Sequence, residues 1–251
     1  MQSAKRIAKQ DYRKLSEAQR IDLCSIRQVD RILWLRSGCG ELVEYQITQG
    51  QTPMKAAIIV AHPDDESIWS GGLILQKPDW EWTVLSLCRG DDPDRSRKFE
   101  SVGGLLGFDA FISDVDDSDP LKQIDAQRDI GSRILNFLAS TCWDLCLTHG
   151  SNGEYGHLRH KEVHGEVLRL AHEGTLECRQ LWTFAYECNV QERFCRPDPH
   201  VNVLVHLADK ELFEKRRIVH REYGYEEDSF EVRSCITPES FRRSIVREEQ
   251  Q

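Results

Sequence analysis

Short apolar runs alternate with amphipathic segments along most of the chain, from about residue 55 onward. Residues 56–61 read Ala-Ala-Ile-Ile-Val-Ala between polar flanks, a pattern typical of a strand buried on both faces of a parallel sheet. We predict further strands over 82–88, 108–112, 145–148, 180–186 and 201–207. Apolar positions three or four apart predict helices over 68–75, 95–106, 121–138, 161–171 and 209–223. Such alternation indicates a layered α/β sandwich with right-handed crossovers.

The first 52 residues precede this alternating pattern. Residues 20–35 carry apolar positions at helical spacing, and residues 41–47 alternate loosely like a short strand. We therefore expect residues 1–52 to be an N-terminal extension packed on the core and residues 53–251 to form the main domain. A helix that binds a partner or makes a homo-oligomer is the alternative interpretation of the extension. The charged tail beyond residue 224 has no clear assignment.

Composition narrows the classes of partner. The chain has 251 residues and a net charge of −9, which argues against a general affinity for nucleic acid or anionic membranes. It shows neither the apolar core of a signal peptide nor the roughly 18 apolar residues of a membrane span, so we expect a cytoplasmic protein. The nine cysteines are odd in number and contain no Cys-x-x-Cys pair, which favours reduced, structural thiols.

A cluster of polar residues follows the first predicted strand: His62-Pro63-Asp64-Asp65-Glu66. Open α/β sheets place ligands at the carboxyl ends of their strands. His62 and Asp65 lie three apart across a proline-restricted turn, so both could bind one metal ion. With a further imidazole this set is typical of catalytic zinc, which keeps one position open for water; Asp64 would then touch that water. A helix N-cap is the alternative interpretation of the acidic residues.

A second cluster follows the predicted strand 145–148. His157, His160 and His164 come after a glycine-containing loop, at the carboxyl end of another strand. His160 and His164 are one helical turn apart, which allows a local two-histidine site, although His-Lys-Glu-Val-His is not the His-Glu-x-x-His of zincins. We interpret His164 as a histidine without a metal role. The two clusters together suggest a one-metal hydrolase.

These two motifs, Ala61 to Glu66 and Gly156-His157-Leu158-Arg159-His160, resemble those of the LmbE-like (PIG-L) superfamily of metal-dependent N-acetylglucosaminyl deacetylases. The resemblance spans about residues 55–223. It implies a Rossmann-like three-layer α/β/α sandwich with a mostly parallel sheet. It also implies zinc, with ferrous iron as the alternative, held by residues His62, Asp65 and His160.

The resemblance further implies roles for four other residues. Asp64 would be the general base and His157 the electrophilic or acid histidine. Tyr155 would lie near the reacting carbonyl. Arg97 would line the substrate pocket, although a position on the helix surface is the alternative interpretation. Many relatives read His-Pro-Asp-His where this chain has Leu158-Arg159, so a carboxylate that orients His157 must come from elsewhere or be absent.

The resulting hypothesis is a zinc-dependent hydrolase. It would remove the N-acetyl group from a small-molecule amino-sugar conjugate containing N-acetylglucosamine, releasing acetate and a free amine. An amidase acting on another N-acyl sugar or a thiol-sugar conjugate is one alternative. A metal-bound sugar-binding protein without turnover is another, against which the intact Asp64 argues. A dinucleotide-dependent enzyme is disfavoured because no Gly-x-Gly pattern follows the first predicted strand.

Overall fold

The chain divides into two compact units, Met1–Pro53 and Met54–Gln251. The structure is a computed structural model that describes residues 5–7, 32–36, 42–47, 53–119, 121–189, 191 and 193–245. The packing of residues 1–52 on the core stays a prediction.

The first unit contains a three-stranded sheet in the order β1-β3-β2. Its strands are β1 (Lys5–Ile7), β2 (Ile32–Arg36) and β3 (Leu42–Ile47). β3 confirms the strand expected near residues 41–47. β2 shows that the helix expected over 20–35 is wrong at its end, and residues 20–31 lie outside the described residues. Short apolar runs do not separate helix from strand, and here the antiparallel pairing of β2 with β3 decides.

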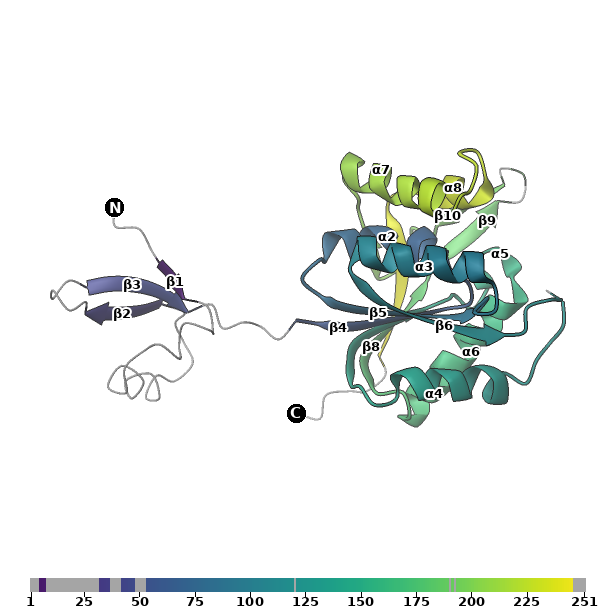
Figure 1. The fold of residues 1–251 in the computed structure, drawn as a ribbon, viewed down its shortest axis with the longest axis horizontal. Helices are drawn as coiled ribbons and strands as arrows, with labels where there is room; N and C mark the ends of the chain where they lie inside the picture. The colour runs from purple at the N-terminus through teal and green to yellow at the C-terminus, as the bar shows by residue number, and fades with distance from the viewer. Residues whose placement is uncertain are drawn as a thin grey trace. The chain divides into compact units, whose positions relative to one another are not determined.

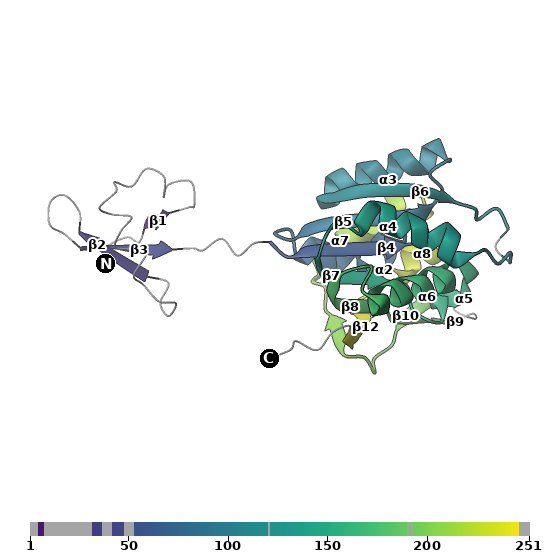
Figure 2. The same cartoon turned by 90° about the horizontal axis from the view of Figure 1, so that it is seen from below.

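The second unit is built on a seven-stranded sheet in the order β11-β12-β8-β7-β4-β5-β6 (Figures 1 and 2). The five strands from β8 to β6 are parallel, whereas β12 and β11 pair antiparallel at one side. The bounds are β4 (Lys55–Val60), β5 (Glu81–Cys88), β6 (Phe108–Val115), β7 (Trp143–Thr148), β8 (Cys178–Phe184), β11 (Val203–Val205) and β12 (Glu239–Ile245). A separate hairpin pairs β9 (Tyr186–Asn189) with β10 (Phe194–Pro197).

Helices cover both faces of this sheet (Figure 1). One face carries α2 (Asp65–Gln76), α3 (Pro93–Leu106), α7 (Asp209–Arg217), the π-helical turn η4 (Ile218–Glu222) and α8 (Phe230–Ser234). The other carries the π-helical turn η3 (Gln127–Gly131), α4 (Ser132–Leu138) and α6 (Leu158–Glu173), with the short α5 (Gly153–Gly156) before α6. The three-layer α/β/α fold with a mostly parallel sheet is confirmed. No helix in the described part of the chain is long and apolar enough to cross a bilayer.

The apolar run of β4 explains why the sheet is covered twice. Ala56, Ile58 and Val60 belong to the core cluster under α2 and α3, and the alternate residues Ala57 and Ile59 to the cluster under α4 and α6. All are fully buried. Side chains of a strand alternate between faces, so a continuous apolar run requires a layer on each side.

One further expected helix needs correction, and the structure assigns the segment that the sequence left open. The helix expected over 121–138 begins later, because residues 121–125 form a loop before η3 and α4. The tail beyond residue 224, which had no assignment, forms α8 and β12, and β12 extends the sheet.

A buried ion pair joins Lys215 on α7 to Glu239 on β12, and it also holds α2 against this C-terminal strand. Lys215 Nζ lies 2.6 Å from Glu239 Oε1, and both side chains are fully buried. Glu239 also accepts the backbone N–H groups of Gly72 and Leu73 in the middle of α2, at 2.7 and 2.8 Å. Buried charges are tolerated when paired and hydrogen-bonded in this way. Residues at the start of α2 are thereby held in place by the end of the chain.

We predict that Lys215→Met lowers the free energy of unfolding by about 3–5 kcal/mol, because it leaves the Glu239 carboxylate buried without its cation. Urea denaturation of the variant and the parent measures the difference. Lys210→Met, at an exposed position of α7, the helix that carries Lys215, is the control and should change stability little. A loss below about 1 kcal/mol for Lys215→Met would show that the pair is not what holds these elements.

Candidate metal centre

The order of the strands determines where the two sequence clusters meet. From β4 the chain moves through β5 to β6 on one side, then returns to β7 and β8 on the other. The connections leaving β4 and β7 therefore run in opposite directions. The space outside the carboxyl ends of these two neighbouring strands, called the crevice below, is where open α/β sheets bind their ligands. His62 to Asp65 follow β4, and the segment from His149 to His160 follows β7.

Three predicted ligands come together in this crevice. His62 Nδ1 lies 3.2 Å from His160 Nε2 and 3.3 Å from Asp65 Oδ2. His160 Nε2 lies 3.4 Å from the same Asp65 oxygen. The three donor atoms thus form a nearly equilateral triangle. Zinc bound at 2.0–2.1 Å in a tetrahedron would need ligand atoms about 3.3–3.4 Å apart, so the residues fit the metal that the sequence implies.

Carboxylates behind the two histidines direct the donor atoms. His160 Nδ1 is 2.6 Å from Glu154 Oε2, and His62 Nε2 is 2.8 Å from Asp117 Oδ2. When each of these nitrogens donates its hydrogen to a carboxylate, the other nitrogen presents a lone pair to the triangle. This is the arrangement that orients metal-binding histidines and raises their basicity.

The charges around the triangle favour a cation. Burial raises the pKa of Asp65, but its electrostatic interactions with His160 and His149 outweigh burial and hold that pKa well below its usual value. Burial lowers the pKa of His62, but its hydrogen bonds to Asp117 and Asp65 outweigh burial and raise the pKa to about 9. The crevice therefore stabilises positive charge, and a metal would compete there with a proton.

His149, which the sequence did not single out, has a structural part in the centre. Its Nε2 accepts the backbone N–H of Ala61 at 2.9 Å, so its hydrogen sits on Nδ1, which donates to Glu154 at 2.9 Å. Its ring stacks on that of His160 with centroids 3.8 Å apart. Although His149, Asp65 and His160 form a compact group, the hydrogen bond to Ala61 occupies the nitrogen that faces the metal position. His149 fixes the end of β4 and the ring of His160.

Asp64 lies beside the triangle with an unusual backbone conformation. Its φ is 127°, in the region that favours glycine, and its N–H donates to Glu66 Oε2 at 3.1 Å. Burial, together with the charge of Asp65, raises the pKa of Asp64 to about 7. Its Oδ2 accepts hydrogen bonds from Tyr225 and from Arg95, the latter at 3.2 Å. Strained residues of this kind concentrate at functional sites.

His157 and Tyr155 lie at the mouth of the crevice. The His157 ring centroid is 4.9 Å from that of His62, and its Nδ1 accepts the backbone N–H of Arg159 at 3.2 Å. Burial and the charge of His160 lower the pKa of His157 to about 4, so it is neutral at pH 7 and carries its hydrogen on Nε2. Tyr155 is 40 % exposed, with its ring centroid 5.2 Å from that of His160.

The structure does not bring Arg97 to this crevice. Its side chain is 76 % exposed and pairs with Asp94 at 2.6 Å. Helical geometry explains the difference, because Arg95, two positions earlier on α3, faces the crevice instead. Arg95, Tyr225 and Asp117 were not identified from the sequence as residues of the site. Asp117 follows the end of β6, and the rule that ligands gather at the ends of parallel strands could have found it; no local signal marks Tyr225.

Comparisons with known proteins agree with this architecture. No family model matches the chain. A curated protein of Acanthamoeba polyphaga mimivirus, uncharacterized protein L374, is 27% identical over 166 residues, covering 57% of this chain and 68% of that protein. Among solved structures, the N,N'-diacetylchitobiose deacetylase of Pyrococcus horikoshii superimposes with a TM-score of 0.58 at 14% identity, covering 79% of this chain and 88% of that one.

A hydratase has the same fold. GalB, the 4-carboxy-2-hydroxymuconate hydratase of Pseudomonas putida KT2440, also gives a TM-score of 0.58 at 14% identity, over 79% of this chain and 99% of that one. At such identities the similarity establishes the fold, a Rossmann-like α/β/α sandwich. That fold is the one that the sequence motifs led us to expect.

We predict that Glu154 makes the folding stability of the metal-free protein depend on pH. Burial raises its pKa, but the charges and hydrogen bonds of His149 and His160 outweigh burial and lower it to about 2 from an ordinary 4.5. A depressed pKa stabilises the fold above the unfolded value and loses that contribution as pH falls towards the folded value. The parent should therefore lose stability faster than Glu154→Gln between about pH 4.5 and pH 2. Urea titrations with chelator at successive pH values measure both slopes; parallel slopes would contradict the assignment.

Proposed function

We propose that this protein is a zinc-dependent hydrolase that removes the N-acetyl group from a small molecule containing N-acetylglucosamine. The products are acetate and a free amine. The observation that carries the proposal is the triangle of His62, Asp65 and His160 donor atoms with the Asp64 carboxylate beside it. The fold shared with the chitobiose deacetylase supports the reaction class, and the two sequence motifs support the sugar.

His62, Asp65 and His160 would hold the metal. Two neutral imidazoles and one carboxylate suit zinc and leave a coordination position open; imidazole and carboxylate also suit ferrous iron. The chemistry supplied by zinc would be a lower pKa for bound water, near 7, and polarisation of the acetamide carbonyl.

Asp64 is the proposed general base. A pKa near 7 lets a carboxylate accept a proton at neutral pH and return it in a later step. Within the described chain, the hydrogen bonds to this side chain go to Oδ2, from Arg95 and Tyr225. Oδ1 therefore remains to accept the proton of the attacking water. The same carboxyl group would then deliver that proton to the nitrogen of the departing amine.

His157 is the proposed donor to the carbonyl oxygen. Because it is neutral with its hydrogen on Nε2, it would act by hydrogen bonding rather than as an imidazolium acid. The backbone N–H of Arg159, rather than a carboxylate, would set the tautomer of His157, consistent with the Leu158-Arg159 that stands where many relatives have an aspartate. Tyr155, half-exposed at the mouth, would close over the acyl group. Arg95 replaces Arg97 as the proposed arginine of the pocket.

The alternatives differ in what they release. An amidase acting on another N-acyl sugar or a thiol-sugar conjugate would use the same residues and liberate a different acid. The fold shared with GalB adds hydration of an unsaturated hydroxy acid, which releases nothing. A binding protein would retain the sugar unchanged. A panel of N-acetylglucosamine conjugates, other N-acyl sugars and an unsaturated hydroxy acid, followed by mass spectrometry, separates these outcomes; metal-loaded protein inert across the panel would overturn the proposal.

We predict that Asp64→Asn retains zinc but loses about 10²–10⁴-fold in turnover, because the amide cannot accept the proton. Acetate release and metal content are measured together. Asp91→Asn, an exposed aspartate on the loop before α3, is the matched control and should keep full activity. An active Asp64→Asn variant would remove Asp64 from the mechanism.

We also predict that His160→Ala abolishes stoichiometric zinc binding and with it activity, since only two donors of the triangle remain. Chelation of the parent should abolish activity reversibly, with recovery on adding zinc. His172→Ala, an exposed histidine near the end of α6, should bind zinc as the parent does. Equal zinc content in His160→Ala and the parent would place the metal elsewhere.

A further inference from the structure

A buried arginine lies next to a proposed metal ligand. Arg159 precedes His160 on α6 and is only 1 % exposed. A guanidinium is seldom buried, because its desolvation is costly unless the charge is paired, and a cation near a metal position would also oppose metal binding. Its partners are Glu162 on the same helix and Asp117 in the loop that follows β6. The pairing with Asp117 is the part that reaches the metal centre.

Asp117 stands between this arginine and His62. Its Oδ2 is 2.8 Å from His62 Nε2, and its Oδ1 is 3.5 Å from Arg159 Nε. In the described part of the chain, Asp117 Oδ1 and Arg159 Nε are the buried side-chain polar atoms without a hydrogen bond, so their mutual charge attraction is what compensates them. The carboxylate is thus held with one oxygen towards the histidine and the other towards the arginine.

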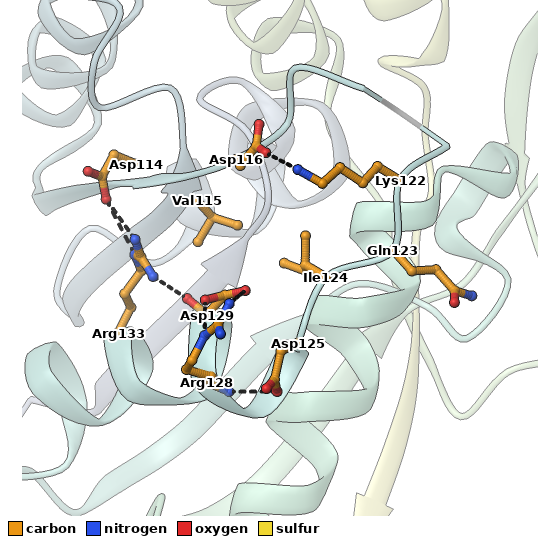
Figure 3. Close-up of a pocket in the computed structure, with 10 residues that line it drawn as sticks. All are labelled: Asp114, Val115, Asp116, Lys122, Gln123, Ile124, Asp125, Arg128, Asp129 and Arg133. Carbon is orange, nitrogen blue, oxygen red and sulfur yellow. Dashed lines mark hydrogen bonds and ion pairs between the residues drawn. The ribbon is translucent and has the colours of Figure 1, made fainter.

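The loop that carries Asp117 is tied to α6 as well. Arg159 donates to the carbonyl oxygen of Lys122 at 3.4 Å, and Glu162 accepts the N–H of Ile124 at 3.2 Å. The loop also borders a cavity of about 380 Å³, whose charged lining residues pair with one another, as Asp116 does with Lys122 (Figure 3). The carboxylates of the cavity are therefore engaged locally, whereas Asp117, which does not line the cavity, is directed to His62.

We infer that Asp117 is a positioning residue that fixes the tautomer of His62, with Arg159 holding its second oxygen. This inference rests on the proposed metal site. A neutral imidazole has one hydrogen, and donating it from Nε2 to Asp117 leaves the Nδ1 lone pair facing Asp65 and His160. Arg159 keeps the carboxylate from turning and balances its charge. Without Asp117, the hydrogen could occupy Nδ1 and block the ligand position.

The test is the zinc affinity of Asp117→Asn, measured by competition with a chromophoric chelator rather than by activity. The amide must turn its NH₂ group either to His62, where it favours hydrogen on Nδ1, or to Arg159, where two donors would face each other; either orientation loses an interaction that the carboxylate makes. We expect zinc to bind about 10–100-fold more weakly, as for other partners of metal-binding histidines. Asp116→Asn, the adjacent and more exposed carboxylate, is the matched control and should keep the affinity of the parent.

A second measurement covers the case in which Asp117→Asn fails to fold. Long-range ¹H–¹⁵N spectra of the metal-free parent at alkaline pH, where the neutral ring carries one hydrogen, report which nitrogen of His62 carries it, with His62→Gln used for assignment. The hydrogen is expected on Nε2. A hydrogen on Nδ1, or an unchanged zinc affinity in folded Asp117→Asn, would overturn the inference. Failure of the deacetylase proposal is distinguishable, because it would show as absent acetate release with zinc affinity and tautomer as expected.

Discussion

The arrangement of this site depends on one electrostatic constraint: two imidazole nitrogens and a carboxylate oxygen are held 3.2–3.4 Å apart. Each histidine has its other nitrogen paired with a carboxylate, Glu154 or Asp117, so the facing nitrogens present lone pairs unless a proton binds there, as the His62 pKa of about 9 allows in the absence of a metal. Lone pairs at this separation repel unless a cation lies between them. The fold brings these three atoms together because the segments after β4 and β7, which carry the three residues, leave neighbouring strands in opposite directions.

Much of this architecture could be predicted from residue patterns. The continuous apolar run before His62 indicates a strand covered on both faces, and strand ends locate the ligands. The rule that ligands gather at strand ends, together with the two sequence motifs, was enough to predict that His62, Asp65 and His160 lie close together. The N-terminal segment shows the limit, because Leu33 and Trp34 fit a helical spacing yet lie in β2, where pairing with another strand decides.

The residues that were missed share a physical reason. Asp117, Arg95 and Tyr225 act through contacts with partners 31 to 161 positions away, and no local periodicity encodes such distances. Arg97 was expected in the pocket, but Arg95 on the same helix reaches it instead, because two positions along a helix point to nearly opposite sides. Sequence spacing identified the helix, but only packing identified the arginine that reaches Asp64.

Residues of the C-terminal part of the main domain support the backbone and side chain of Asp64. Tyr225 donates to Asp64, and Tyr223 donates to Glu66 at 2.6 Å, whose other oxygen accepts the N–H of Asp64. The strained backbone of Asp64 is therefore supported from both its side chain and its amide. Glu239 on the last strand holds the middle of the same helix through Gly72 and Leu73. A resemblance that ends near residue 223 thus leaves out Tyr225 and Glu239, which place the proposed base, so truncation there would affect the reaction centre rather than a peripheral tail.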